Sequence, residues 1–302
     1  MTVLPSRQRH APLPASATSA PVRVRANRPK RAPVVPYVVV IAWVAVSLAP
    51  VLWMLSSSIK PPPDVFAIPP KWFFHISLQN YSNLFSTETG SQFGRYITMS
   101  LVVTLGTTLL AMLVSVPASY ALTFLPVNRR ELWMSLILLA SMLPPIVIVV
   151  PLFNFWQLLN QLDSPVALIF TYAAMNTPFT IWLVRGFMAQ IPRELYESAR
   201  IDGATHLTTL LRVMVPLVRA GMAAAAIFVV INSWNELLFA LFLTNTNRTA
   251  PAGIVATLIS DRGMNWGLLY AASTAVALPI IVFTIAVQRH VVRGFTFGAV
   301  KG

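Results

Sequence analysis

The sequence has 302 residues, of which 56% are hydrophobic and only 10% are charged, and it contains no cysteine. Soluble globular domains carry about 25% charged residues, so this composition argues against a soluble protein and favours one that places apolar surface in a lipid bilayer. The lack of cysteine excludes disulfides and thiolate metal sites, and the net charge of +13 has to be interpreted through its distribution along the chain.

The first predicted segment is a basic arm, residues 1–36. It is rich in proline, alanine, serine and arginine, and it holds seven basic residues and no acid. Such a composition predicts a disordered cytoplasmic arm. A signal peptide is disfavoured because the basic region is long and the next apolar run has the length of a membrane span. The arm is read as a solvated tail that helps to set topology, with binding of anionic lipid headgroups as the alternative.

Six apolar stretches follow, each near the roughly 20 residues that a helix needs to cross the hydrocarbon of a bilayer. They cover residues 37–59, 96–125, 132–157, 165–184, 220–243 and 268–288. The second and third contain prolines, which membrane helices tolerate when neighbouring groups satisfy the freed carbonyls. The sequence therefore predicts an all-α polytopic membrane protein with six transmembrane helices, in which residues 37–302 form one domain.

Lysine and arginine in the loops predict the orientation of these spans. Seventeen of them fall in the two termini and the even-numbered loops, and five fall in the odd-numbered loops. The positive-inside rule then places both termini in the cytoplasm. This placement accounts for the basic charge, so no nucleic-acid partner is needed.

The loop between the fourth and fifth spans, about residues 185–219, has a local pattern of its own. Pro192 can open a helix in its first turn, and Glu194 and Glu197 then lie near the positive end of that helix dipole. Gly203 can end the helix in a left-handed conformation, and a second helical run over residues 207–215 leads into the fifth span. The pattern predicts a helix–turn–helix elbow on the cytoplasmic face, able to enter a partner's groove and transmit a rigid-body movement.

This loop resembles the EAA motif of ABC importer permeases, which reads Glu-Ala-Ala, three residues, Gly, nine residues, Ile, any residue, Leu-Pro. The spacing is kept throughout, with the matching residues Glu197, Ser198, Ala199, Gly203, Val213, Val215 and Pro216. Identity departs at Ser198, Val213 and Val215, which are mild changes of size or branching. The Asp202-Gly203-Ala204 triplet is typical of the carbohydrate branch of that family.

Other segments resemble the same branch, in particular permeases similar to the inner six-span subunit of the maltose transporter. They are Lys60-Pro61 with Asp64-Val65, Asn80-Tyr81 with Phe85, Trp234-Asn235-Glu236, and the C-terminal residues 293–302. Met99 departs from the family, which often has Asn there. The resemblance covers roughly residues 34–302, and its weight comes from several correctly spaced motifs in order.

The resemblance implies a permease subunit of an ATP-driven importer for a sugar or related polyol. Its partners would be a second similar permease, two ATPase subunits that bind ATP and Mg²⁺, and an extracytoplasmic solute-binding protein. The residues implied in ATPase coupling are Glu194, Glu197, Ser198, Ala199, Asp202, Gly203 and Ala204, with Gly298 and Lys301 as candidates for ATPase contact in the C-terminal tail. The chain contains no Gly-x-x-x-x-Gly-Lys-Ser/Thr phosphate cradle, so we expect no ATP hydrolysis and no bound cofactor in this chain.

Glu236 is the only acid that we place inside a predicted span, and intramembrane ionisable residues are candidates for function. The sequence leaves three hypotheses for Glu236: a structural role, contact with a sugar, and proton coupling. Candidates for the substrate path are Tyr172, Asn176, Asn232, Trp234, Asn235 and Glu236. In the maltose system the partner permease contacts the sugar, which weakens this assignment.

No catalytic cluster and no metal-ligand spacing is present in the sequence. Two other functional classes are alternatives to an ABC importer permease. An ion-coupled secondary transporter would need titratable residues within the spans and often an internal repeat, and the sequence offers only Glu236. A membrane scaffold without a transport path is disfavoured by the EAA spacing. The sequence does not distinguish among sugars, polyols and glycerophosphate compounds.

Overall fold

The computed structural model describes residues 34–260 and 263–296. The predicted arm up to residue 33 and the tail residues Gly298 and Lys301 lie outside the described residues. The chain divides into two units, residues 1–47 and 48–302. Helix α1 (Val34–Ser58) begins three residues earlier than the predicted first span, because Val34 and Val35 continue its apolar run.

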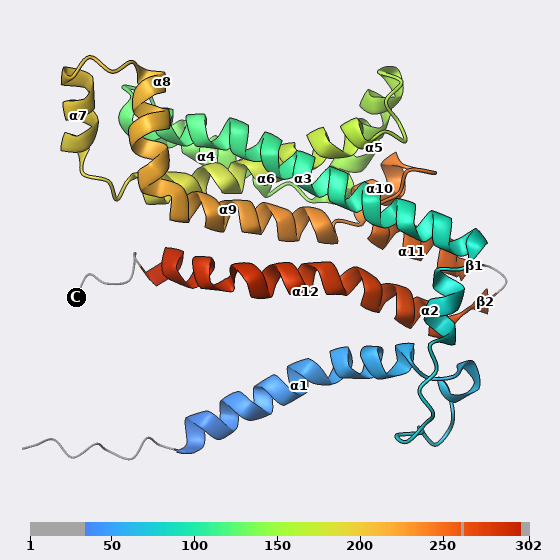
Figure 1. The fold of residues 1–302 in the computed structure, drawn as a ribbon. Helices are drawn as coiled ribbons and strands as arrows, with labels where there is room; N and C mark the ends of the chain where they lie inside the picture. Colours follow the sequence, from blue (N-terminus) through green and yellow to red (C-terminus); the bar gives the residue numbers. More distant parts are fainter. Residues whose placement is uncertain (1–33, 261–262, 297–302) are drawn as a thin grey trace, which may run out of the picture. The chain divides into compact units, whose positions relative to one another are not determined.

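The second unit is built from helices, as Figure 1 shows. Apart from one two-residue β pair, the described residues form an all-α fold, as predicted. The elements after α1 are η1 (Pro62–Asp64), α2 (Gln79–Leu84), α3 (Thr87–Phe124), α4 (Arg130–Ser141), α5 (Pro145–Leu158), α6 (Pro165–Met188), α7 (Arg193–Ile201), α8 (His206–Thr209), the π-helical turn η2 (Leu210–Met214), α9 (Val215–Asn235), α10 (Leu238–Leu243), α11 (Ala250–Leu258), β1 (Ile259–Ser260), β2 (Gly263–Met264) and α12 (Trp266–Thr296).

Helices α3, α6 and α9 pack together and form the centre of this unit. Small residues permit the close approach that membrane helices use in packing. A Cβ atom built on Gly221 of α9 would lie 2.2 Å from Cγ of Phe187 in α6, so only glycine fits there. Ser119 of α3 adds a polar link, because its hydroxyl donates to the carbonyl of Ile181 in α6 at 3.0 Å.

Five of the described helices are long and apolar enough to cross a membrane, namely Val35–Ser58, Gln92–Phe124, Pro165–Met188, His206–Asn235 and Trp266–Val287. A sixth span results if the pair α4 and α5 counts as one. These two helices are bent by 88°, so the predicted third span is a broken one. Pro144 and Pro145 explain the break, since proline lacks an N–H and disfavours a helical conformation in the residue before it. Single prolines such as Pro117 remain inside continuous helices.

The fifth span also differs from the prediction of residues 220–243. Its helix starts at His206, so the expected second short helix is the first part of the span itself. The π-helical turn η2 widens the backbone just before Pro216, which accommodates the proline ring without ending the helix. At the other end α9 stops at Asn235, and the backbone breaks at Glu236 and Leu237 before α10 begins.

Candidate functional site

The elbow is formed by α7, the turn after it and α8, and it lies at one end of the α3–α6–α9 bundle (Figure 1). Pro192 is the N-cap of α7 with extended backbone (φ −54°, ψ 132°), one position earlier than the first-turn position that we expected. Glu194 lies in the first turn, as predicted. Arg193 Nε lies 3.1 Å from Glu197 Oε1, which is an exposed pair across one helical turn and adds little stability.

The turn after α7 is closed by backbone hydrogen bonds around Gly203. Gly203 has φ +83°, and its N–H donates to the carbonyl of Arg200 at 3.2 Å. The N–H of Ala204 donates to the carbonyl of Ala199 at 3.1 Å. This pair of bonds is the Schellman arrangement, in which a left-handed residue ends a helix. Thr205 then caps α8, since its hydroxyl accepts from the N–H of Thr208 at 3.2 Å. The predicted left-handed glycine is confirmed.

One side of α7 is anchored to α3 by aromatic rings. The Tyr196 ring stacks on Phe124 at a centroid distance of 5.1 Å, and the Tyr120 ring lies 6.2 Å away. Phe124 is the last residue of α3. The elbow is therefore packed against a long helix of the bundle. This contact was not predicted from the sequence, although the Tyr120 and Phe124 spacing of four residues places both on one side of a helix.

The other side of the elbow is open to solvent. Large apolar side chains that are exposed on the elbow are Leu195 and Ile201 of α7 and Leu207 of α8. Ile201 is 85% exposed. Because it lies outside the apolar spans, contact with lipid does not account for this exposure. An exposed apolar side chain outside the membrane spans, such as that of Ile201, can mark a surface for a protein partner. The seven predicted coupling residues all lie in α7 and the turn after it. Five of them are exposed, namely Glu194, Glu197, Ser198, Asp202 and Gly203.

The predicted substrate-path residues fall into two groups. Tyr172, Asn176 and Trp234 are buried, whereas Asn232 and Asn235 are exposed. The structure brings Asn176 and Asn232 together, because the Asn232 amide donates to Asn176 Oδ1 at 3.2 Å and so joins α9 to α6. The Trp234 ring N–H donates to the carbonyl of Val276 in α12 at 3.2 Å. Asn235 donates to the carbonyl of Ile231 within its own helix.

Glu236 corrects our expectation that it lies within a continuous span. It sits in the break after α9, and its carboxylate accepts from the N–H of Phe239 at 2.9 Å and of Ala240 at 3.3 Å. These are first-turn donors of α10, which have no partner inside their own helix. The structure therefore gives this carboxylate a capping role, and its bonds go to α10 and not to Asn232 or Asn235. The hydroxyl of Tyr172 faces the same carboxylate.

Comparisons with known proteins bear on this arrangement. Residues 115–296, which include the elbow and the capped break, match the family model described as binding-protein-dependent transport system inner membrane component. The probable ABC transporter permease protein y4oR of Sinorhizobium fredii is 38% identical over 85% of this chain and 91% of its own length. The diacetylchitobiose uptake system permease protein DasC of Streptomyces coelicolor is 34% identical over 84% of this chain and 91% of its own length.

The fold also matches a solved structure. A chain of a bacterial ABC transporter involved in the import of the acidic polysaccharide alginate superposes with a TM-score of 0.71 at 20% identity, over 85% of this chain and 95% of that chain. At that identity the likeness concerns the fold. The elbow and the three-helix centre therefore belong to a known membrane architecture.

Proposed function

Because the chain belongs to the family of binding-protein-dependent transport system inner membrane components, we propose that it forms one half of the path by which a sugar or related polyol enters the cell. The chain is a multi-pass inner membrane permease of the ABC importer class. The other half of the path would come from a second, similar permease. The sugar class is supported by the diacetylchitobiose relative and by the Asp202-Gly203-Ala204 triplet.

The elbow would receive the movement of a separate ATPase. The observation that carries this proposal is the pairing of two surfaces on α7: Tyr196 holds the helix to α3, while Ile201 projects an uncovered apolar side chain on the solvent side. A helix that is packed against the bundle on one side and exposes an apolar side chain on the other can dock in a groove of the ATPase. It can then transmit a movement of the ATPase to the bundle. Glu194, Glu197, Ser198, Ala199, Asp202, Gly203 and Ala204 would form or shape the docking surface.

The remaining partners are proposed from the family to which the chain belongs. Two ATPase subunits would hold ATP and Mg²⁺, and a solute-binding protein, which the family description implies, would deliver the ligand on the outer side. The elbow and both termini would lie in the cytoplasm, in agreement with the seventeen basic residues assigned to that side by the positive-inside rule. Gly298 and Lys301 of the tail would add a second ATPase contact. Closure of the ATPase pair would then move the permeases as rigid bodies.

Substitution of one exposed apolar residue tests the docking surface. Ile201→Ser should greatly reduce co-purification of the ATPase and uptake of sugar, at unchanged amounts of chain in the membrane. Ile76→Ser is the matched control, because Ile76 is also highly exposed, at 75%, and lies in the loop before α2. Full retention of the ATPase by Ile201→Ser would contradict the proposed docking surface.

A further inference from the structure

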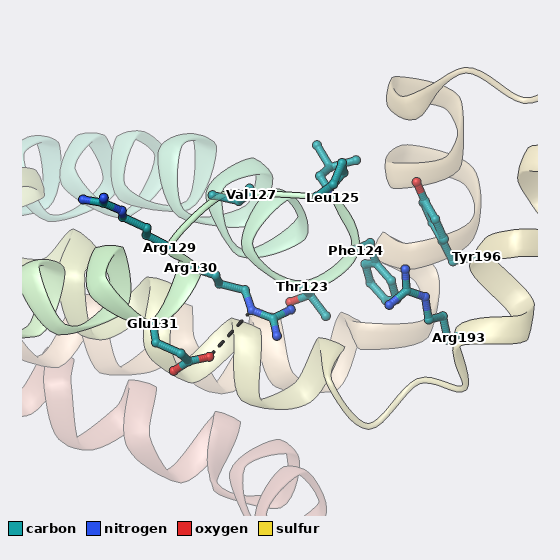
Figure 2. Close-up of a pocket in the computed structure, with 10 residues that line it drawn as sticks. Thr123, Phe124, Leu125, Val127, Arg129, Arg130, Glu131, Arg193 and Tyr196 are labelled. Atoms are coloured by element: carbon teal, nitrogen blue, oxygen red, sulfur yellow. Dashed lines mark ion pairs between the residues drawn. The ribbon is translucent and has the colours of Figure 1, made fainter.

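A pocket of about 570 Å³ opens beside the elbow, and we name it the elbow pocket. Figure 2 shows its lining, which comes from the end of α3, the loop to α4, the start of α4 and α7. The aromatic and charged residues of its lining are Phe124, Arg129, Arg130, Glu131, Arg193 and Tyr196. Its wall includes the same Phe124 and Tyr196 rings that anchor α7.

The charge of the elbow pocket is predominantly positive. Three arginines line it against one acid, Glu131. Glu131 Oε1 lies 3.7 Å from Arg130 Nε and 3.7 Å from Arg185 Nη2, so its negative charge is shared between two guanidinium groups. Arg193 pairs with Glu197, which does not line the pocket. Figure 2 shows the Arg130 side chain ending beside Thr123.

Arg129 adds a further positive charge at the outer side of the pocket. Its side chain extends away from Tyr196 in Figure 2, and within the described part of the chain it forms no ion pair. Its backbone is left-handed, with φ +56°, a conformation that costs energy for a residue other than glycine. The loop thus holds two consecutive arginines at the mouth of a basic pocket, at a cost in backbone energy. Planar guanidinium groups bind phosphate oxygens with paired hydrogen bonds.

The apolar surface beside the pocket indicates which kind of phosphate fits. Immediately after Arg130 and Glu131, α4 exposes Leu132, Trp133 and Leu136, and the end of α3 marks the edge of a membrane span. Tryptophan and arginine together are typical of the membrane–water interface. An anionic phospholipid has both a phosphate for the arginines and acyl chains for the α4 surface, whereas a free phosphate uses only the first.

We propose that the elbow pocket binds the phosphate headgroup of an anionic phospholipid, with its acyl chains along α4. Arg130 and Arg193 clamp the headgroup from α4 and α7, and Arg129 attracts it at the mouth. The bound lipid holds α7 against α3 and so sets the position of the elbow. The assignment of the lipid to the cytoplasmic leaflet and its effect on coupling rest on the proposed function, in which the elbow faces the cytoplasm.

Quenching of Trp133 tests the site with the full chain in neutral-detergent micelles. Brominated phosphatidylglycerol or brominated phosphatidylcholine is added, and a Trp133→Phe variant supplies the signal of the other tryptophans. In the wild type, brominated phosphatidylglycerol should quench the fluorescence of Trp133 at a several-fold lower mole fraction than brominated phosphatidylcholine does. The double variant Arg129→Gln, Arg130→Gln should lose this preference. Arg212→Gln should keep it, because Arg212 is exposed near the elbow and does not line the pocket.

Three outcomes would overturn the proposal. Equal quenching of wild type by both lipids removes the headgroup preference. Equal loss in Arg212→Gln and the double variant assigns the preference to the general basic charge. A rise in melting temperature with inorganic phosphate over chloride at equal ionic strength, without a lipid preference, assigns the pocket to a free phosphate. Because the assay contains no ATPase or sugar, its failure would leave the Ile201→Ser test of the proposed function untouched.

Discussion

The ring of Tyr196 in α7 stacks on the ring of Phe124 at the end of α3, with centroids 5.1 Å apart and planes inclined by 19°. This contact joins the elbow to a helix that packs against α6 and α9 in the centre of the unit. In the proposed function, a displacement of α7 would be passed to α3 through this aromatic contact. The stacked pair is a direct mechanical link between the proposed ATPase surface and the bundle.

Removal of the Tyr196 ring should uncouple the elbow. Aromatic pairs contribute about 1 kcal/mol beyond the area that they bury, so Tyr196→Ala should lower uptake several-fold while the amount of chain in the membrane is kept. Tyr196→Phe retains the ring and should transport nearly as wild type. The measurement is sugar uptake together with ATP hydrolysis by the assembled complex. Wild-type coupling in Tyr196→Ala would show that the stack carries no movement.

The turn at Gly203 should depend on backbone conformation and not on space. No atom lies within 4 Å of a Cβ built at this position, yet its φ of +83° disfavours residues with a side chain. A β-branched residue there costs roughly 1–2 kcal/mol. Gly203→Val should therefore weaken ATPase coupling and uptake, whereas Gly203→Asn, which tolerates this conformation, should be much less affected.

A thermal-shift comparison separates that effect from general unfolding. The turn lies outside the helix bundle and can distort or open locally to relieve the strain, so both melting temperatures should stay close to that of wild type while coupling differs. If valine and asparagine at position 203 support equal ATPase-coupled uptake, the left-handed turn is not what the elbow requires.

The elbow was predictable from sequence because its signals are local. Pro192 and Gly203 act on the backbone around themselves, and the left-handed turn falls on the glycine that follows the predicted helix. The broken third span was harder, since Pro117 is held inside a continuous helix while the Pro144-Pro145 pair ends one. A second consecutive ring removes another N–H and adds another steric conflict, so the number of adjacent prolines decides between a bend and a break.

The site contacts that sequence analysis missed join distant parts of the chain. Nothing in the local pattern pairs Tyr196 with Phe124, because the contact arises only when α7 folds back on α3. Glu236 was identified as unusual, but its role depends on where α9 ends, and no proline or glycine marks that break. The carboxylate itself accepts from the first-turn N–H groups of α10, which is a capping pattern shifted by one residue from its usual place.

Asp163 should make the stability of the loop between α5 and α6 depend on pH. Its Oδ1 accepts from the N–H groups of Asn245, Thr246 and Asn247 at 2.9, 3.0 and 2.8 Å. Burial alone would raise the pKa of Asp163, but the hydrogen bonds from Asn247, Asn245 and Thr246 outweigh it and hold the pKa below its usual value. The stabilisation is therefore complete above the unfolded pKa of about 3.9.

Acidification should then remove this stabilisation as the pH falls through the lower folded-state pKa. Asp163→Asn keeps an oxygen acceptor but does not titrate there. The melting temperature of wild type should exceed that of Asp163→Asn above about pH 4, and the difference should shrink at lower pH. The measurement is the melting temperature of both proteins across this range, and a constant difference would exclude Asp163 as the titrating group.

Glu236 should act as a helix cap and not as a proton carrier. Loss of an N-cap acceptor costs about 0.5–2 kcal/mol, so Glu236→Ala should lower the melting temperature and reduce uptake. Glu236→Gln retains a side-chain oxygen that can accept from Phe239 or Ala240, and it should support uptake at a level close to wild type across the pH range. Uptake by both variants, with chain levels measured in parallel, decides between the two roles. A proton carrier must titrate and glutamine does not, so abolished uptake in Glu236→Gln with the melting temperature unchanged would assign the carboxylate to proton movement.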